Sequence, residues 1–432
     1  RPQRHEAFEG QRFRASSLQN PEYGVPHGGF RGITRNGRPR HVSTIAFRYA
    51  SIRAVPSGTL KRRCDHHFGK NLMDRRSIIK HAGIAGVLAA GIAPAAHAQA
   101  AVRWRLASSF PKSLDTIFGS AEMFAKTVRA LSGGKFEVSV HAAGELMPAF
   151  GVVGALQNGT IEMAQTAPYY FTGKSSIFAF GCAVPFGLTA RQMDAWMEHG
   201  NGRKLMDAFY ANYNIKSRSA GNTGTQMGGW YRKEIKTVAD LKGLKMRMGG
   251  GLFGEAMQKL GVVPQNMPGG DVYQALEKGT LDATEFVGPY DDEKLGFNKV
   301  APFYYYPGWW EGGAELEFFI NTKAYAALTP EFQAIVDAAT TVAARDMTAK
   351  YDAFNPIALK RLVAAKTQLK AFPKEIMDAG YKASMEVFAE HEAKSAEFKT
   401  IHQDMRAFQR DQLLWARYSE LRFDNYMTGV KL

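Results

Sequence analysis

A short internal repeat constrains the fold of this chain more than any other feature. The octapeptide ALQNGTIE at residues 155–162 returns as ALEKGTLD at residues 275–282. Each copy has the composition of a helix end, a glycine cap and a strand start, and each follows a segment that predicts a strand and a helix. Matches of this length occur by chance, but here the order of the predicted elements agrees as well. The repeat therefore predicts an α/β protein with two similar βαβ lobes, whose strand ends line the cleft between them.

The segments outside the repeat predict how the lobes are joined. Given two such lobes, residues 217–222 and 315–322 would be the strands that cross between them. We therefore expect residues 99–221 and 313–350 to form lobe 1, and residues 222–312 to form lobe 2.

The C-terminal region, residues 351–432, has a helical pattern throughout. Thr329 and Pro330 mark the start of a long helix, and we expect breaks near Pro356 and at Pro373. Apolar residues in the last helices indicate that they either wrap the lobes or meet a second copy of the chain. These residues include Ile401, Met405, Phe408, Trp415 and Tyr418.

The stretch KTVADLKGLKMRMGGG at residues 236–251 places an arginine at a strand end. Thr237 and Asp240 form a variant capping box on one helical turn, which Gly243 ends. Residues 244–248 then alternate as a short strand, so Arg247 lies at its carboxyl end, beside glycines that let a ligand approach the backbone. Ligands of open α/β sheets bind at this edge, and a guanidinium fits a carboxylate in bidentate fashion. A solvated arginine fits the local pattern equally well.

The positive charge of the chain lies mostly near its N-terminus. The formal net charge is +15, but residues 1–72 contribute +10 and residues 73–100 contribute +2, which leaves +3 for residues 101–432. The nearly balanced body of the protein gives no reason to expect a nucleic-acid partner. We interpret residues 1–72 as an extension upstream of the true start, or otherwise as a disordered tail.

Residues 73–98 have the pattern of an export signal. A paired arginine at 75–76 precedes a short apolar run at 84–92 and a small-x-small cleavage site at 96–98. The sequence DRRSIIK resembles a twin-arginine signal, and the ordinary secretory route remains an alternative. We therefore expect a soluble protein exported to the periplasm. Only Cys182 would remain after cleavage, so no internal disulfide forms and this thiol is expected to be buried.

The sequence favours a binding protein over an enzyme. The four histidines after residue 100 fit no catalytic triad or metal-binding pattern, and the glycine runs match neither a P-loop nor a dinucleotide-binding fingerprint. These histidines are His141, His199, His391 and His402.

Several motifs resemble the solute-binding proteins of TRAP (tripartite ATP-independent periplasmic) transporters. LKGLKMR at 241–247 and the second repeat copy point to the family as a whole. The glycine-rich stretches GNTGTQMGGW at 221–230 and PGWWEGG at 307–313, with DATEFVGPY at 282–290, resemble the branch that binds 2-oxo or 2-hydroxy acids through a bound cation. The resemblance covers residues 101–432. It implies a two-lobed periplasmic solute-binding fold with an interlobe cleft and long C-terminal helices, and TRAP permease subunits as partners. A homodimer joined by residues 351–432 is suggested separately, by the apolar residues of the last helices.

The resemblance also assigns roles to individual residues. Arg247 matches the arginine that grips the ligand carboxylate. Gln226, Glu285, the carbonyl of Phe286 and Glu311 match the positions around a metal ion and the ligand's oxo or hydroxyl oxygen. Residue 286 is usually tryptophan in this branch. Phenylalanine is a mild change if only the carbonyl serves the ion, and it leaves more room if the ring packs on the ligand. Glu311 also fits a surface turn, since two glycines follow it.

Three further residues are candidate ligand contacts. Tyr169 and Tyr170 follow the first repeat copy and would face the cleft from lobe 1, and we expect one of them to touch the ligand. Asn222, in the first glycine-rich stretch, completes the predicted set of ligand-binding residues.

Charge counting supports a cation at this site. Two ionised glutamates and a ligand carboxylate total −3, against +1 from Arg247, so a buried site must protonate a glutamate or take up a cation. Oxygen-only ligands select a hard ion, either Na⁺ or Ca²⁺. We therefore expect a receptor for a small 2-oxo monocarboxylate such as pyruvate. A lactate-type 2-hydroxy acid bound with Ca²⁺, a dicarboxylate, or a receptor of an ATP-driven importer remain alternatives.

Overall fold

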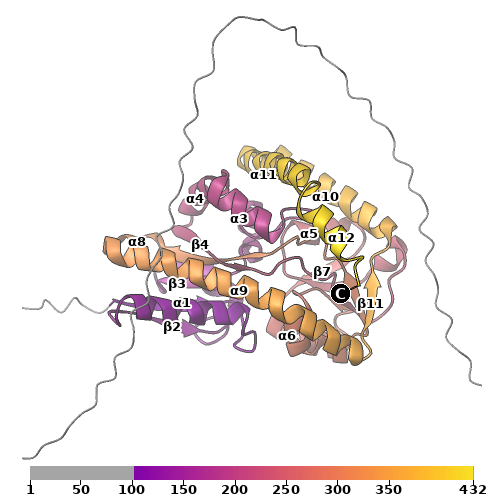
Figure 1. The fold of residues 1–432 in the computed structure, drawn as a ribbon, viewed down its shortest axis with the longest axis horizontal. Coiled ribbons are helices and arrows are strands. Elements are labelled where there is room, and N and C mark those ends of the chain that lie inside the picture. Colours follow the sequence, from indigo (N-terminus) through magenta and orange to yellow (C-terminus); the bar gives the residue numbers. More distant parts are fainter. Residues whose placement is uncertain (1–101, 432) are drawn as a thin grey trace, which may run out of the picture. The chain divides into compact units, whose positions relative to one another are not determined.

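The computed structural model describes residues 102–431, and two separate sheets organise this part of the chain (Figure 1). The predicted N-terminal extension at 1–72 and the signal at 73–98 lie outside the described residues. The first sheet has the strand order β2-β1-β3-β10-β4, and the second has the order β11-β9-β5-β8-β6-β7. We call each sheet, with the helices that cover it, a lobe.

The strands of lobe 1 are β1 (Val102–Ser108), β2 (Phe136–His141), β3 (Met163–Thr166), β4 (Ile215–Asn222) and β10 (Glu315–Asn321). Those of lobe 2 are β5 (Trp230–Tyr231), β6 (Lys245–Met248), β7 (Val263–Asn266), β8 (Ala283–Thr284), β9 (Phe303–Tyr306) and β11 (Gln368–Ala371). With the helices listed below, they confirm the predicted α/β class.

The two copies of the repeat occupy equivalent places in the two lobes. In lobe 1 the short helix α2 (Val152–Gln157) ends before Gly159, whose φ is 72°, and β3 follows. In lobe 2 the helix α6 (Gly269–Glu277) ends before Gly279, whose φ is 74°, and β8 follows. β3 pairs in parallel with β1, and β8 pairs in parallel with β6. The repeat thus encodes the same helix–glycine–strand unit twice, as the sequence predicted.

The strands β4 and β10 carry the chain between the lobes. They pair antiparallel inside the first sheet, and the last residue of β4, Asn222, lies opposite the first residue of β10, Glu315. The chain leaves lobe 1 after β4 and returns to it at β10. The loops at this end of the strand pair therefore lie between the two sheets.

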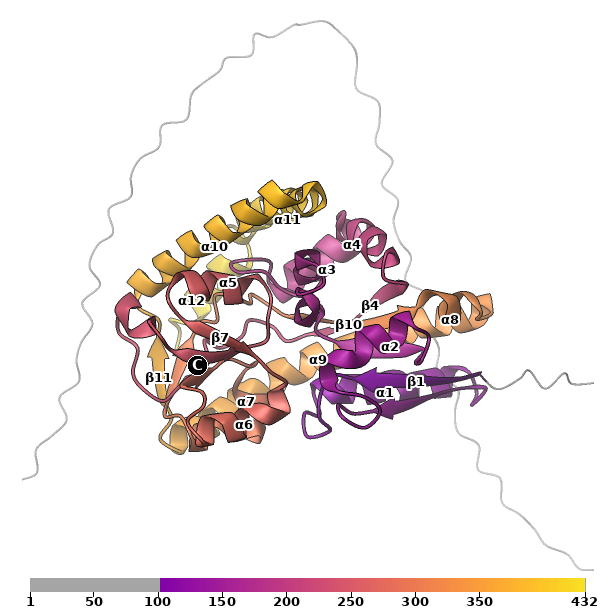
Figure 2. The ribbon, with the colours of Figure 1, turned by 180° about the vertical axis from the view of Figure 1, so that it is seen from behind.

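The long helix α9 (Pro330–Ala364) spans both lobes (Figures 1 and 2). It packs on α1 (Ile117–Leu131) and β4 of lobe 1 and on α7 (Pro289–Leu295) of lobe 2. The predicted break near Pro356 is wrong, because the helix continues through this proline. Ala358 and Leu362 are buried beyond it, and this packing offsets the hydrogen bond that a proline cannot donate.

The C-terminal helices lie on the side of the molecule opposite α9 (Figure 2). The helix α10 (Lys374–Lys394) packs on α5 (Leu252–Lys259), whereas α11 (Ala396–Ala416) packs on α3 (Ala190–His199) and α4 (Gly202–Ala211). Phe398, Ile401 and Met405 are buried, so most of α10 and α11 wraps the chain's own lobes. The region is not helical throughout, because β11 adds to the second sheet by pairing in parallel with β9. Four residues that alternate weakly gave no clear signal for a strand that depends on this distant pairing.

The remaining short elements connect these layers. They are α8 (Thr322–Ala326), α12 (Glu420–Met427), η1 (Ala149–Gly151), η2 (Pro168–Phe171), η3 (Ser176–Gly181), η4 (Val238–Leu241) and η5 (Phe297–Lys299). No helix among residues 102–431 is both long enough and apolar enough to cross a membrane.

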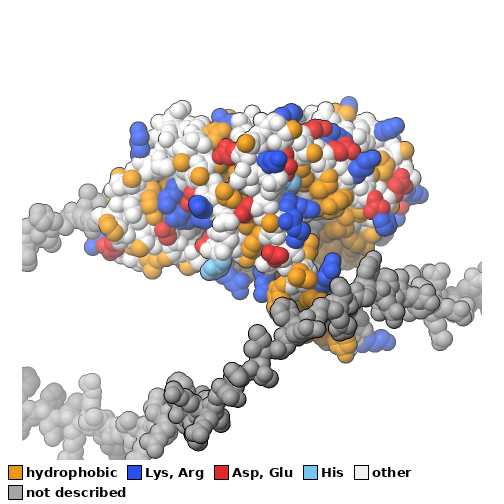
Figure 3. All heavy atoms as spheres, turned by 90° about the horizontal axis from the view of Figure 1, so that it is seen from above, with side chains coloured by type: hydrophobic (Ala, Val, Ile, Leu, Met, Phe, Trp, Pro, Cys, Tyr) orange, Lys and Arg blue, Asp and Glu red, His pale blue; other side chains and the backbone are white. Residues whose placement is uncertain are grey.

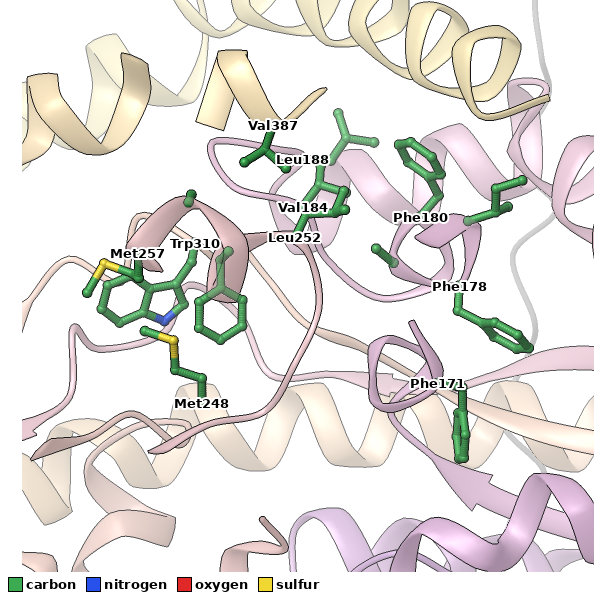
Figure 4. Close-up of a cluster of buried hydrophobic side chains, with 14 of the residues drawn as sticks. Phe171, Phe178, Phe180, Val184, Leu188, Met248, Leu252, Met257, Trp310 and Val387 are labelled. Carbon is green, nitrogen blue, oxygen red and sulfur yellow. The ribbon is translucent and has the colours of Figure 1, made fainter. Parts of the chain in front are cut away.

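One hydrophobic cluster joins the lobes beneath α10 (Figure 4). Phe178 and Phe180 enter it from lobe 1, Met248 and Trp310 from lobe 2, and Val387 from α10. Cys182 is fully buried, as predicted. Burial of apolar side chains from both lobes stabilises the arrangement in which the two sheets face each other.

Candidate ligand and cation site

The local structure around Arg247 follows the prediction. Asp240 closes the capping box by accepting a hydrogen bond from the backbone N–H of Thr237 at 2.9 Å, and Gly243 has a φ of 73°. β6 then begins, and its residue Arg247 lies between β8 and β7. The side chain is only 1% exposed, so the alternative of a solvated arginine is wrong.

The Arg247 guanidinium already donates three hydrogen bonds to other residues of the protein. Nε donates to the carbonyl of Met267 at 3.0 Å, and Nη1 donates to Glu285 at its Oε1 (2.7 Å) and at its backbone carbonyl (3.0 Å). Nη2 has no hydrogen-bond partner within residues 102–431. The two-nitrogen fork expected from the sequence is therefore not free in this arrangement, and a carboxylate would meet Nη2 alone.

The glycine loop after β6, residues 249–251, lies in close contact with the ring of Tyr169 from lobe 1. A Cβ on Gly249 would lie 2.8 Å from the ring of Tyr169, and Gly250 and Gly251 have φ values of 120° and 79°. The backbone N–H of Gly249 also donates to Glu285 Oε1. The loop was expected to let a ligand approach the backbone, and in the structure it is Tyr169 of lobe 1 that comes close.

The two glycine-rich stretches lie against each other. The N–H of Gln226 donates to the carbonyl of Glu311 at 3.2 Å, and the N–H of Gly308 donates to the carbonyl of Gln226 at 2.8 Å. A Cβ on Gly308 would lie 2.6 Å from the carbonyl oxygen of Met227, so only glycine fits this contact. These backbone bonds hold Gln226 and Glu311 side by side.

A small cavity between the lobes is lined by the predicted tyrosines, Gln226, Arg247 and Phe286. Its volume is about 10 Å³, close to the space of one water molecule, so the lobes are closed around it. The remaining lining residues are Phe110, Ile117, Ala167, Thr223, Val287, Ala314 and Leu316.

Five buried polar atoms of the predicted ligand and cation residues lack a hydrogen-bond partner in the described part of the chain. They are Gln226 Oε1, Glu285 Oε2, both side-chain oxygens of Glu311, and Arg247 Nη2. Buried polar atoms are nearly always partnered, so such a group indicates a ligand-binding site.

The unpartnered oxygens also fit a hard cation. Among the described residues no three His, Cys, Asp or Glu side chains are grouped to hold a metal. The set here is of another kind, because it combines two carboxylates with an amide oxygen. All of these donors are oxygen atoms, which Na⁺ and Ca²⁺ prefer.

Burial shifts the titration of both glutamates. It raises the pKa of Glu311 well above its usual value, and the nearby charge of Glu285 raises it further, whereas Arg247 and Tyr169 oppose the shift. The pKa of Glu285 is also raised by burial, although Arg247 and the Gly249 N–H counteract this. Both carboxyls therefore bind a proton more readily than a solvated glutamate does, in line with the charge count from the sequence.

The structure brings most, but not all, of the predicted site residues together. Tyr169 and Tyr170 both line the cavity, and the Phe286 ring lies under the Arg247 guanidinium at 5.3 Å. Asn222 is elsewhere: its Nδ2 donates to Glu315 Oε2 at 3.0 Å, and it lines a different cavity of about 650 Å³ between β4, α9 and the α3–α4 helices. Thr223 was not predicted, although it lies in the quoted GNTGTQ stretch. The apolar lining residues carried no signal that sequence reasoning could use.

Comparison with known proteins agrees with this geometry. Residues 107–395 match the DctP family, described as bacterial extracellular solute-binding protein, family 7. A monocarboxylate 2-oxoacid-binding periplasmic protein of a Nostoc species is 48% identical over 76% of this chain and 90% of its own length.

Two solved structures of TRAP transporter solute-binding proteins are also similar. The protein from Bordetella bronchiseptica is 49% identical with a TM-score of 0.75, over 76% of this chain and 97% of that one, and was solved as a dimer with calcium and picolinate in one active site. The protein from Pseudoalteromonas atlantica is 38% identical with a TM-score of 0.73, over 76% and 99%, and contains sodium and pyruvate. The chain described here therefore belongs to family 7 of the bacterial extracellular solute-binding proteins, as a TRAP transporter solute-binding protein.

Proposed function

We propose that this protein binds a small 2-oxo monocarboxylate of the pyruvate type together with Na⁺ or Ca²⁺ and delivers it to a TRAP permease. One observation carries the proposal. Gln226 Oε1 and Arg247 Nη2, which belong to residues lining the interlobe cavity, have no partner within residues 102–431, and the same is true of Glu285 Oε2, beside Arg247, and of both side-chain oxygens of Glu311, beside Gln226. The relatives that bind pyruvate with sodium, or picolinate with calcium, support this choice of ligand and ion.

Each polar group has a role in this proposal. Arg247 Nη2 donates to the ligand carboxylate, as a charge-assisted hydrogen bond. The cation is held by Gln226 Oε1, Glu285 Oε2, Glu311 and the carbonyl of Phe286, and it neutralises the charge that two carboxylates and a ligand anion would otherwise accumulate. The cation supplies electrostatic attraction for the ligand's carboxylate and oxo oxygens.

Lobe 1 completes the site when the lobes close. Tyr169 and Tyr170 belong to lobe 1, whereas Arg247 and Glu285 belong to lobe 2. A ligand that touches both sets has more contacts in the closed form than in an open one, so binding favours closure. The ligand would have to widen the cavity, which is smaller than pyruvate in this structure.

The apolar lining explains the preference for a monocarboxylate. Phe110, Ile117 and Leu316 form part of the cavity wall, and none of them can pair with a second charge. A second carboxylate would lose its hydration there without gaining a partner, which is costly. A methyl group or short alkyl chain would gain from the same surface.

We propose further that the protein works in the periplasm and releases its ligand unchanged. The predicted export signal at 73–98 supports the location. The site offers binding groups but no nucleophile paired with a general base, which acyl or phosphoryl transfer would need. Recovery of unaltered pyruvate after prolonged incubation with the protein would agree with this, and conversion of pyruvate would contradict it.

A thermal-shift panel tests the proposed ligand and ion together. It would compare pyruvate, longer 2-oxo acids, lactate and succinate, each with Na⁺, with Ca²⁺ and with neither. We expect the largest rise in Tm with a 2-oxo monocarboxylate plus a cation, because ligands that bind the folded state stabilise it. The ion and the ligand should each tighten the other's binding by the same factor. A response to succinate alone, independent of any cation, would contradict the site.

We also propose that the end of the C-terminal region forms a homodimer contact. The exposed apolar residues of α11 and α12 form a patch that includes Leu413, Leu414, Trp415, Tyr418, Leu421, Phe423 and Tyr426. Hydrophobic side chains gather on the protruding part of the molecule in Figure 3. An exposed apolar patch of this kind is typical of an interface, and the Bordetella relative is a dimer.

Deletion of residues 413–432 tests the dimer. Removal of the chain after Pro373 would also strip α10 and α11 from their own lobes, so a later cut is the cleaner test. We expect light scattering to show a dimer for the intact protein and a folded monomer for the deletion variant. Gln403→Glu, an exposed change on the same helix, is the control and should remain dimeric. A monomeric intact protein would contradict the proposal.

A further inference from the structure

Thr223, one residue beyond β4, contacts the Gln226 side chain at the proposed cation site. Its hydroxyl accepts hydrogen bonds from Gln226 Nε2 at 3.1 Å and from the N–H of Ala314 at 3.1 Å. The same hydroxyl donates to the carbonyl of Gly224 at 2.9 Å. Thr223 and Gln226 are each only 3% exposed, so water does not compete freely for these bonds.

The hydrogen-bonding capacity of the Thr223 hydroxyl is therefore full. A hydroxyl has one hydrogen to donate and two lone pairs that accept. Because the hydrogen goes to Gly224, the hydroxyl can only accept from Gln226. The amide must then turn its NH₂ group toward Thr223 and its oxygen away from it.

This choice matters because the two ends of a glutamine amide have nearly the same shape. Packing alone distinguishes poorly between the two orientations, and the hydrogen-bond network decides between them. The Gln226 backbone is already fixed by its bonds to Glu311 and Gly308. The terminal flip of the amide is the freedom that remains, and it exchanges an oxygen for an NH₂ group at the same place.

We propose that Thr223 is a positioning residue that makes Gln226 present its oxygen, rather than its nitrogen, to the cation. Gln226 Oε1 has no partner within the described residues, as expected of an atom held ready for an ion. The inference rests on the proposed cation-assisted function. It adds a residue whose hydroxyl is fully used by the protein, and so is not a ligand of the ion, yet sets the affinity for the ion.

Thr223→Val and Thr223→Ser separate the hydroxyl from the shape of the side chain. Valine keeps the volume of threonine but can neither accept from Gln226 nor donate to Gly224, whereas serine can do both. The measurement is the affinity for Ca²⁺ and for Na⁺ by titration calorimetry in the presence of saturating pyruvate. We expect Thr223→Val to weaken cation binding by roughly tenfold, as is typical when a group that orients a metal ligand is lost. Thr223→Ser should stay within about twofold of the natural protein.

Thr225→Val is the matched control. Thr225 is exposed, and its hydroxyl donates to the carbonyl of Gly312 at 2.9 Å, so this change removes a neighbouring hydroxyl without touching the Gln226 amide. It should leave cation affinity unchanged.

A double-mutant cycle distinguishes positioning from a general loss of structure. If Thr223 acts through Gln226, then Thr223→Val should add nothing to the loss of affinity caused by Gln226→Ala. The inference is overturned if Thr223→Val alone leaves cation affinity unchanged, or if it costs the same factor in the Gln226→Ala background. A natural protein that responds to neither cation would instead contradict the proposed function, and this inference with it.

Discussion

Glu311 and the pair Glu315 and Glu317 are buried glutamates close together in the sequence, but they differ in how many hydrogen-bond partners their side-chain oxygens have. Glu311 is fully buried, and neither of its side-chain oxygens has a partner among residues 102–431. Glu315 and Glu317, on β10, are equally buried. Glu315, however, is hydrogen-bonded by the Ser219 hydroxyl and by Asn222 Nδ2, and Glu317 Oε1 accepts from the Ser217 hydroxyl at 3.3 Å.

Burial and pKa alone do not separate the two groups. Burial raises the pKa of Glu315 and of Glu317 to about 8, and it raises the pKa of Glu311 well above its usual value. What differs is the supply of partners. β4 places Ser219 and Asn222 beside Glu315, and Ser217 beside Glu317. Both oxygens of Glu315 and one of Glu317 are therefore partnered, although Glu317 Oε2 is not, whereas neither oxygen of Glu311 has a partner within residues 102–431. A buried carboxylate with neither oxygen partnered, more than one whose pKa is raised, therefore indicates a ligand.

Replacing Glu311 or Glu315 by glutamine should give the largest difference in ligand affinity between two variants. We expect Glu311→Gln to weaken the cation-dependent binding of pyruvate by roughly 100-fold, equivalent to about 2.8 kcal/mol, because it removes a charge that faces the ion. Glu315→Gln should leave binding within about threefold, since its partners can equally bond an amide. Titration calorimetry with and without Ca²⁺ measures both. Equal losses in the two variants would abolish the distinction between the groups.

Arg247→Lys tests whether the guanidinium belongs to the ligand site or only to Glu285. Lysine keeps the charge but cannot serve Met267, Glu285 and a ligand at once, so we expect pyruvate affinity to fall by at least roughly tenfold. Tm should also fall by several degrees, because buried hydrogen bonds are lost. Calorimetry and thermal unfolding of the same samples check the two effects. A lower Tm with unchanged affinity would make Arg247 purely structural.

The glutamates on β10 should be visible in the pH dependence of stability. A carboxyl whose pKa is about 8 in the folded state and about 4.3 when unfolded binds its proton more tightly in the folded protein. Stability is therefore lost as the pH rises from about 4.5 to 8. Glu315→Gln removes this contribution, so its Tm relative to the natural protein should be several degrees higher at pH 9 than at pH 5. A difference in Tm that does not vary with pH would contradict the raised pKa.

The sequence predicted the helices and strands that depend on local signals better than those that depend on packing against distant segments. The repeat and the capping box before Arg247 depend on local spacing and on glycines at positive φ, which a single sequence displays, and β4 and β10 were predicted from the two-lobed arrangement that the repeat implies. Pro356 and β11 depend on packing against distant segments, which can override local preference.

The same limit applies to the candidate site. Arg247, Gln226, Glu285 and Glu311 could be predicted as site residues because the motifs that carry the resemblance contain them. Nothing local distinguishes Glu311 from Glu315, since the difference arises only when the register of β4 against β10 places serines beside one and not the other. Asn222 illustrates the consequence. It lies four residues from Gln226 along the chain, but its side chain is hydrogen-bonded to Glu315 on β10 and not directed to the candidate ligand site.

Asn222→Asp is the finest test of the comparison and should have the smallest effect on ligand binding. Aspartate has the shape of asparagine and keeps the oxygen that accepts from the N–H of Gly224, at 3.0 Å, but replaces the donor that faces Glu315. If Asn222 belongs with the β10 glutamates, pyruvate affinity should change by less than about twofold, while Tm falls because two acids must share a buried site. If it contacts the ligand, as the sequence suggested, a new negative charge would repel the carboxylate and weaken binding by roughly tenfold or more. Calorimetry and thermal unfolding at pH 7 decide between these outcomes, and a loss of affinity without a loss of Tm would return Asn222 to the ligand site.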